Sequence, residues 1–248
     1  VLDIKLPISN DRYISIVSTN NYNYHPQELS LYSGEMQRLN YSSFYSNTTA
    51  SFRHRLWRMY ANHQIGFQGM FQSLKSTIGD VTSISKQRYE RYMPYIGTGL
   101  QFDNRTIHME ADIKMNLYNW QLEKHSLNRK ETEFSPDARF YLKYSVSATS
   151  DLSLNYRYSE LLQDLRQVYD GDLFTSYRTI VNNSHSPEAD GTHSLTLRYQ
   201  YSQPIKGIFF MLSALGSTTH RHSAYVTTLQ PESEILVSRL IDRSIRPL

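Results

Sequence analysis

Residues 107–117 alternate strictly between apolar and polar side chains, and this period constrains the fold more than any other feature of the chain. On a β-strand, a period of two places every apolar side chain on one face and every polar side chain on the other. A helix would scatter both sets around its axis. The segment therefore predicts a strand with two unlike faces. Its apolar positions are Ile107, Met109, Ala111, Ile113, Met115 and Leu117.

The same alternation returns elsewhere, and roughly eight strands are predicted in all. The composition agrees, because the 20 Tyr and 10 Phe residues favour pleated surfaces. Aromatic residues also collect near the predicted strand ends, as the interfacial girdles of membrane barrels do. The further predicted strands are 38–45, 57–68, 92–102, 138–148, 152–158, 195–201, a strand from Ile208, and 234–242.

Short turns and long links alternate along the chain. Short turns are predicted at 46–50, 103–105, 149–151 and 203–207, and long links near 70–87, 121–136, 160–192 and 219–233. Transmembrane barrels have short periplasmic turns and long outer loops. The predicted strands of about 11–16 residues also exceed the ~5–6 of globular sheets and reach the ~9–11 that cross a bilayer.

Composition and charge exclude several classes of protein. The net charge of +3 comes from 26 basic and 23 acidic residues without a basic run, so no nucleic-acid partner is expected. The absence of Cys excludes disulfides and thiolate metal sites. The chain begins at Val1 without Met and ends at Leu248 in mid-pattern, so we expect a fragment of a larger protein.

Residues 134–225 resemble the C-terminal barrel half of TonB-dependent receptors. The likeness lies in the order strand, brief turn, strand, long outer segment, strand, Pro/Gly turn, strand. The segments that carry it are FSPDARFYLKYSVSATSDLSLNYRYSELLQDLRQVYDG, LFTSYRT and THSLTLRYQYSQPIKGIFFMLSALG.

The resemblance implies an all-β fold, an antiparallel up-and-down transmembrane β-barrel of which residues 1–248 form part of a single domain. Similar proteins close about 22 strands around an internal plug. The implied function is transport of a scarce solute in the bacterial outer membrane. The implied partners are outer-membrane lipid, the plug domain of the same full-length protein, the TonB system and a surface lipoprotein. Neither the plug nor the TonB-contact segment is visible in this sequence.

The polar face of the predicted strands is expected to line the barrel lumen. Glu110 and Asp112 share this face and could serve acid/base chemistry or bind a cation, but a solvated lumen is the favoured interpretation. The basic residues of the neighbouring strands are expected to pair with plug carboxylates, or alternatively to contact an anionic solute. The candidate lumen residues are His108, Glu110, Asp112, Lys114, Arg139, Lys143, Arg157 and Arg198.

The link 160–192 is the best candidate for ligand contact, since loops carry recognition while strands supply a scaffold. His220 and His222 share a strand face, but without a third ligand they predict no metal site. No nucleophile elbow or Gly-rich phosphate loop appears, so no catalytic residue, cofactor or enzymatic activity is predicted. The candidate ligand-contact residues are Tyr169, Asp170, Phe174, Tyr177 and Arg178.

Two alternatives remain open. A surface binding or adhesion module would bury Ile113 and Met115 against another sheet, whereas a barrel would turn them toward lipid. Separately, residues 234–248 resemble a motif of polynucleotide phosphorylases, RNA-processing enzymes that bind phosphates with arginines, here Arg239 and Arg243. Otherwise 235–241 is expected to be a barrel strand, or the segment is an adventitious terminus.

Overall fold

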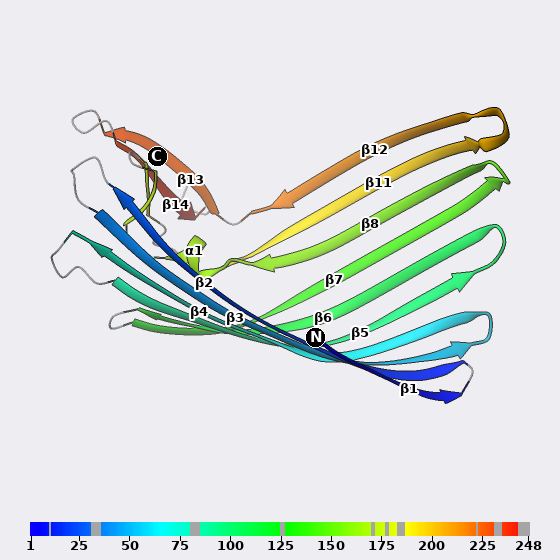
Figure 1. The fold of residues 1–248 in the computed structure, drawn as a ribbon, viewed down its shortest axis with the longest axis horizontal. Coiled ribbons are helices and arrows are strands. Elements are labelled where there is room, and N and C mark those ends of the chain that lie inside the picture. Colours follow the sequence, from blue (N-terminus) through cyan, green and yellow to red (C-terminus); the bar gives the residue numbers. More distant parts are fainter. Residues whose placement is uncertain are drawn as a thin grey trace.

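Ten antiparallel strands form one continuous sheet. The computed structural model describes residues 1–9, 11–30, 36–79, 85–124, 127–169, 172–176, 179–182, 187–221, 223–230 and 235–242. The strand order is β1-β2-β3-β4-β5-β6-β7-β8-β11-β12, so nearly every strand pairs with its neighbour in sequence (Figure 1). The strands are β1 Leu2–Ser9, β2 Arg12–Ser30, β3 Met36–Leu56, β4 Met59–Ile78, β5 Ser85–Asp103, β6 Ile107–Lys124, β7 Leu127–Ser147, β8 Ser150–Leu162, β11 Ala189–Gln203 and β12 Ile208–His220.

The all-β, up-and-down antiparallel fold predicted from the alternation is confirmed. Among the described residues, no pairing joins β1 to β12, so the sheet is open rather than closed into a barrel. It holds ten strands rather than roughly eight, because β1 and β2 were not predicted. The signal was present in β1, where Leu2, Ile4 and Leu6 alternate with polar residues or proline.

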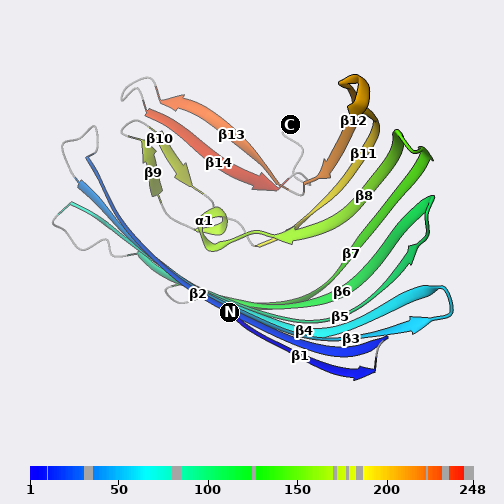
Figure 2. The ribbon, with the colours of Figure 1, turned by 45° about the vertical axis from the view of Figure 1, so that its right-hand side comes forward.

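A second, smaller sheet lies inside the curve of the first (Figure 2). Its strands are β9 Asp172–Ser176, β10 Thr179–Asn182, β13 Ser223–Gln230 and β14 Ile235–Asp242. The sequence correctly predicted a strand near 235–241, but β14 pairs with β13 and β10 and does not belong to the ten-stranded sheet. The short helix α1, Leu165–Val168, lies on the concave face of the large sheet (Figure 2).

The hairpin turns gather at one end of the sheet, as predicted (Figure 1). The turns near 103–105, 149–151 and 203–207 are confirmed, the last as a short 3-10 helix at Pro204–Lys206. The turn predicted at 46–50 is wrong, because β3 continues through these residues to Leu56. The reversal instead occurs at 57–58, where Trp57 adopts a positive φ of 59° and is 84% exposed, so Trp57 does not lie on a strand face.

Three of the four long links were also predicted wrongly. The strands extend into them, so that β6 ends at Lys124 and β7 already begins at Leu127. In the same way, the link predicted near 70–87 is reduced to residues 79–84 between β4 and β5. The link predicted near 219–233 is reduced to residues 221–222 between β12 and β13. The link at 121–136 was predicted because the alternation of β6 changes beyond Leu117. From there the even positions are apolar, as at Trp120, and the odd positions are polar, although the strand continues. Among the strands that the structure describes in the large sheet, β8 and β11 alone are joined by a long connection, which contains α1, β9 and β10.

The core lies between the concave face of the large sheet and a layer formed by residues 162–169 and Leu173. The described helices include none that is long and apolar enough to span a membrane. The core residues are Tyr41, Leu74, Tyr89, Met93, Tyr95, Tyr118, Trp120, Leu122, Leu162, Leu165, Val168, Tyr169 and Leu173.

Candidate functional site

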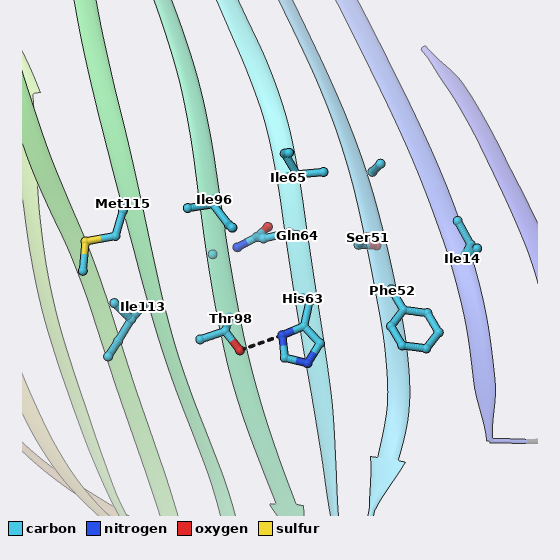
Figure 3. A pocket seen from close by; sticks show the side chains of 12 residues that line it. Ile14, Ser51, Phe52, His63, Gln64, Ile65, Ile96, Thr98, Ile113 and Met115 are labelled. Carbon is cyan, nitrogen blue, oxygen red and sulfur yellow. Dashed lines mark hydrogen bonds between the residues drawn. The ribbon is translucent and has the colours of Figure 1, made fainter. Parts of the chain in front are cut away.

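The outer face of the large sheet, opposite α1, carries an uncovered apolar surface. Ile65, Ile96 and Met115 lie side by side on β4, β5 and β6 in register (Figure 3). Ile65 is 63% exposed, Ile96 61% and Ile113 51%. No part of the chain that the structure describes covers these side chains, which the adhesion hypothesis would bury.

Aromatic rings mark the end of this apolar surface. The ring centroids of Phe71 lie 6.1 Å from Phe44 and 5.4 Å from Tyr92. Beyond them the outer positions become polar, as at Asn119, which pairs with Tyr92. The apolar part therefore spans 92–102 in β5 and 107–117 in β6, which matches the ~9–11 residues with which a tilted strand crosses a bilayer.

The eight candidate lumen residues share the concave face of the sheet. In register, Asp112 lies opposite Arg139 and His108 opposite Lys143 on β7, while Arg157 on β8 lies opposite Arg139. Glu110 and Lys114 occupy the same face of β6 as His108 and Asp112. Arg198 on β11 lies opposite Ser153 of β8. The sequence thus predicted correctly that these side chains share a face; that they line a lumen stays a prediction.

Most of these charges have partners close by. The His108 imidazole lies between two carboxylates, 3.1 Å from Glu110 Oε1 and 3.6 Å from Asp103 Oδ2. The Lys143 ammonium lies 3.1 Å from Asp151 Oδ2, and Asp151 also accepts a hydrogen bond from a serine hydroxyl at 2.8 Å. The Lys114 ammonium lies 3.9 Å above the centre of the Tyr95 ring. These contacts make the face a network of paired charges.

A polar hollow lies at the centre of this network. Asp112 packs directly over Gly99 of β5, where any larger side chain would meet the Asp112 carboxylate. Asn116 Nδ2 donates to Asp137 Oδ2 at 3.0 Å. The hollow can therefore accept a polar group, because its walls carry hydrogen-bond donors and acceptors and side chains of both charges. The residues that line it are Gln64, Asp112, Lys114, Asp137, Ala138, Arg139, Asn155, Arg157 and Tyr158.

The start of the long link between β8 and β11 folds onto the concave face; we call residues 162–169 the inward segment. It turns through α1, whose N-cap Asp164 accepts hydrogen bonds from the backbone N–H of Arg166 at 3.0 Å and Gln167 at 3.1 Å. The Gln167 side chain accepts in return from the Asp164 N–H at 3.0 Å. This reciprocal capping box satisfies the backbone donors of Asp164, Arg166 and Gln167 at the start of the one-turn helix.

Polar side chains of the strands hold the inward segment and β9 in place. Gln72 Oε1 accepts from the backbone N–H of Leu165 at 2.8 Å, and Gln37 Oε1 accepts from that of Phe174 at 3.0 Å. Arg91 Nη1 donates to the Leu162 carbonyl at 3.2 Å. Gln37, Gln72 and Arg91 are all buried, so the link is docked rather than merely placed above the sheet.

The candidate ligand-contact residues were expected to be accessible on one loop, but those that the structure describes are buried or partly buried. Tyr169 is 1% exposed and belongs to the core, so contact with a solute would require the inward segment to move. Phe174 is partly buried on β9. Asp170, Tyr177 and Arg178 lie outside the described residues, as does His222 of the histidine pair. Ligand contact by this link stays a prediction.

Sequence reasoning missed the residues that dock the link, Gln37, Gln72 and Arg91. Each occupies an ordinary polar position in a strand, and its partner lies far away in sequence. In the described ranges, no group of three or more His, Asp or Glu side chains is placed to hold a metal ion.

Burial raises the pKa of the Glu133 carboxyl, and the carboxylates of Glu131 and Glu188 raise that pKa further. Glu133 lies opposite Tyr118 in register, beyond the apolar part of the sheet. A raised pKa means that the folded state holds this proton more tightly than the unfolded chain does. Stability is therefore lost as the pH rises from the ordinary glutamate value through the raised one.

We expect Glu133→Gln to increase the melting temperature at neutral pH and to reduce the stabilisation that the protein gains on mild acidification, because the amide carries no charge to bury. The measurement is thermal unfolding at several pH values. Glu123→Gln, at an exposed position of β6, is the control and should leave the pH dependence unchanged. Identical pH profiles for Glu133→Gln and the unaltered protein would contradict this assignment.

Comparison with known proteins supports the fold. No protein-family model and no curated protein sequence matches the chain. Among solved structures, one described as the copper transporter OprC matches with a TM-score of 0.68 over 95% of this chain, at 10% sequence identity. The chain has an outer-membrane β-barrel-like fold. It spans 40% of the length of that structure, and an identity this low describes the fold and not the solute.

Proposed function

We propose that this chain is part of the wall of an outer-membrane β-barrel, similar to those of TonB-dependent receptors, that transports a scarce solute. The observation that carries the proposal is the apolar outer face, where Ile65, Ile96 and Ile113 are exposed next to one another. Water would penalise so large an apolar surface, whereas the hydrocarbon of a bilayer accepts it.

In this proposed function the outer and concave faces of the large sheet contact different surroundings. The outer face contacts lipid, and the charged concave face, with Asp112, Lys114 and Arg157, lines the solute path. The inward segment narrows the path at the end opposite the hairpin turns, which is the outer end in barrels of this kind. Residues 1–248 then belong to one barrel domain, which forms the wall of the solute path and does not itself provide the energy for transport. A plug domain and TonB are the partners expected to drive transport, with a surface lipoprotein as a further candidate partner.

The proposal predicts where the full-length protein is found and what it needs to stay folded. Expressed in a Gram-negative host, it should sediment with the outer-membrane fraction and require detergent for extraction. Once extracted, it should remain folded only in detergent or lipid, because the apolar outer face must stay covered. A protein recovered from the soluble fraction as a monomer that unfolds cooperatively without detergent would contradict a membrane barrel.

A further inference from the structure

Two arginines face each other across the pairing of β7 and β8. Arg139 and Arg157 are directly opposite in register, and both side chains are exposed on the concave face. Like charges directly opposite one another destabilise a pair of antiparallel strands. A pair of this kind indicates either nearby neutralising charges or an anion that binds between the two.

The neighbouring charges neutralise only one of the two arginines. Asp112 lies opposite Arg139, and Lys114 lies opposite Asp137, so each of these charges on β6 faces an opposite charge on β7. Arg157 is the surplus charge. Its partner on the far side, in β11, is Ser194.

The nearest carboxylates do not remove this surplus. Within the described part of the chain, no acidic side chain lies within ion-pair distance of Arg157. Arg139 Nη2 lies 4.0 Å from Glu110 Oε2, but the other oxygen of Glu110 already contacts His108 at 3.1 Å. The Arg139 side chain is 54% exposed and so remains accessible for a further partner.

Both arginines open into the polar hollow, together with two neutral side chains that can donate hydrogen bonds. These are the amides of Gln64 on β4 and Asn155 on β8. A guanidinium presents a planar fork of donors that fits the two oxygens of a carboxylate or phosphate group. The hollow is also lined by Lys114 and by the carboxylates of Asp112 and Asp137, which lie opposite Arg139 and Lys114 in register. The two carboxylates therefore offset two of the three cations, and the remaining positive charge, two guanidinium forks and two amides suit an oxyanion.

We infer that Arg139 and Arg157 bind an oxyanion group, a carboxylate or a phosphate, carried by the solute that passes along the concave face. The inference rests on the proposed transport function and specifies the class of solute. The bound anion neutralises Arg157 and removes the repulsion between the two guanidinium groups.

The other basic side chains of this face do not offer the same arrangement. Lys143 is paired with Asp151 at 3.1 Å. Arg53 donates to Gln101 Oε1 at 2.7 Å and lies over the ring of Tyr60. Arg198 is exposed but lies opposite Ser153, so it lacks a second arginine across the strands. Arg198 is therefore a matched control, with the same charge on the same face.

The experiment is calorimetric titration of the full-length protein in detergent with inorganic phosphate and, separately, with acetate, at constant ionic strength. We expect saturable binding of at least one of these probes to the unaltered protein. Arg157→Gln should weaken that binding about tenfold or more, since it removes a charge-assisted pair of hydrogen bonds. Arg198→Gln should bind as the unaltered protein does, and the stronger of the two probes identifies the preferred oxyanion.

Two outcomes would overturn the oxyanion site. One is the absence of saturable binding of both phosphate and acetate to the unaltered protein. The other is an equal loss of affinity in Arg157→Gln and Arg198→Gln, which would reflect the general positive charge of the face. Outer-membrane fractionation of the same proteins keeps the two proposals apart, because correct localisation without anion binding contradicts only the site, whereas a soluble protein contradicts the transport function.

Discussion

Ile113→Arg is expected to destabilise the membrane-inserted protein by about 2–4 kcal/mol, the cost of a cationic side chain on the lipid face of a barrel near the bilayer midplane. Ile113 is 51% exposed on the outer face and lies within the apolar part of β6, next to Met115 (Figure 3). If the outer face contacts lipid, a guanidinium there lies in hydrocarbon without water to solvate it. If this face were instead exposed to water, the same substitution would cost little.

The measurement is chemical unfolding of the full-length protein in lipid vesicles. Gln200→Arg is the matched control, because Gln200 is exposed on the concave face opposite Asp151, where an added cation meets a carboxylate. We expect the control to lie within about 0.5 kcal/mol of the unaltered protein. Similar unfolding free energies for the two variants would show that the outer face does not contact lipid.

Trp120→Ala is expected to cost about 3–5 kcal/mol, the usual range for removing a large buried aromatic side chain. Trp120 is 1% exposed, and its ring centroid lies 6.4 Å from that of Tyr89 in the core beneath the inward segment. The cavity would remove part of the surface on which Leu165 and Val168 pack. The inward segment should therefore open more often than in the unaltered protein.

Hydrogen exchange of residues 162–169 measures this opening, and the variant should lose protection there before the strands do. The chain provides its own control, since Trp57 is the second of its 2 tryptophans and is 84% exposed in a turn. Trp57→Ala should change the stability by no more than about 0.5 kcal/mol. Unchanged exchange at 162–169 in Trp120→Ala would mean that the inward segment does not depend on this core.

The sequence predicted the part of the sheet with an apolar outer face better than the other part. In β6 the alternation of 107–117 identified both faces, because apolar residues there all turn outward. From Tyr118 onward the apolar side chains turn inward instead, as those of Trp120 and Leu122 do. This reversal of the pattern resembles the end of a strand, so the long link predicted at 121–136 was wrong.

The docking of the link between β8 and β11 could not be predicted from local pattern. Gln72 and Leu165 are 93 residues apart in sequence, and Gln37 and Phe174 are 137 apart. Nothing in the neighbourhood of either glutamine distinguishes it from a polar residue exposed to water. The opposition of Arg139 and Arg157 was only partly predictable. The two-residue turn between β7 and β8 was close to the predicted position, but Arg139 lies opposite Arg157 only because the register shifts between Ser145 and Ser147, and nothing in the sequence indicated this shift.

The small size of α1 leads us to expect a particular order of assembly. A helix of one turn is unstable by itself, since isolated helices shorter than about 12–15 residues are marginal in water. The surface that stabilises α1 comes from β3, β4, β5 and β6, through Tyr41, Leu74, Tyr89 and Trp120. That surface exists only after these strands have paired, so we expect the ten-stranded sheet to form first and the inward segment to dock last. Until that final step, the concave face is open at the end opposite the hairpin turns.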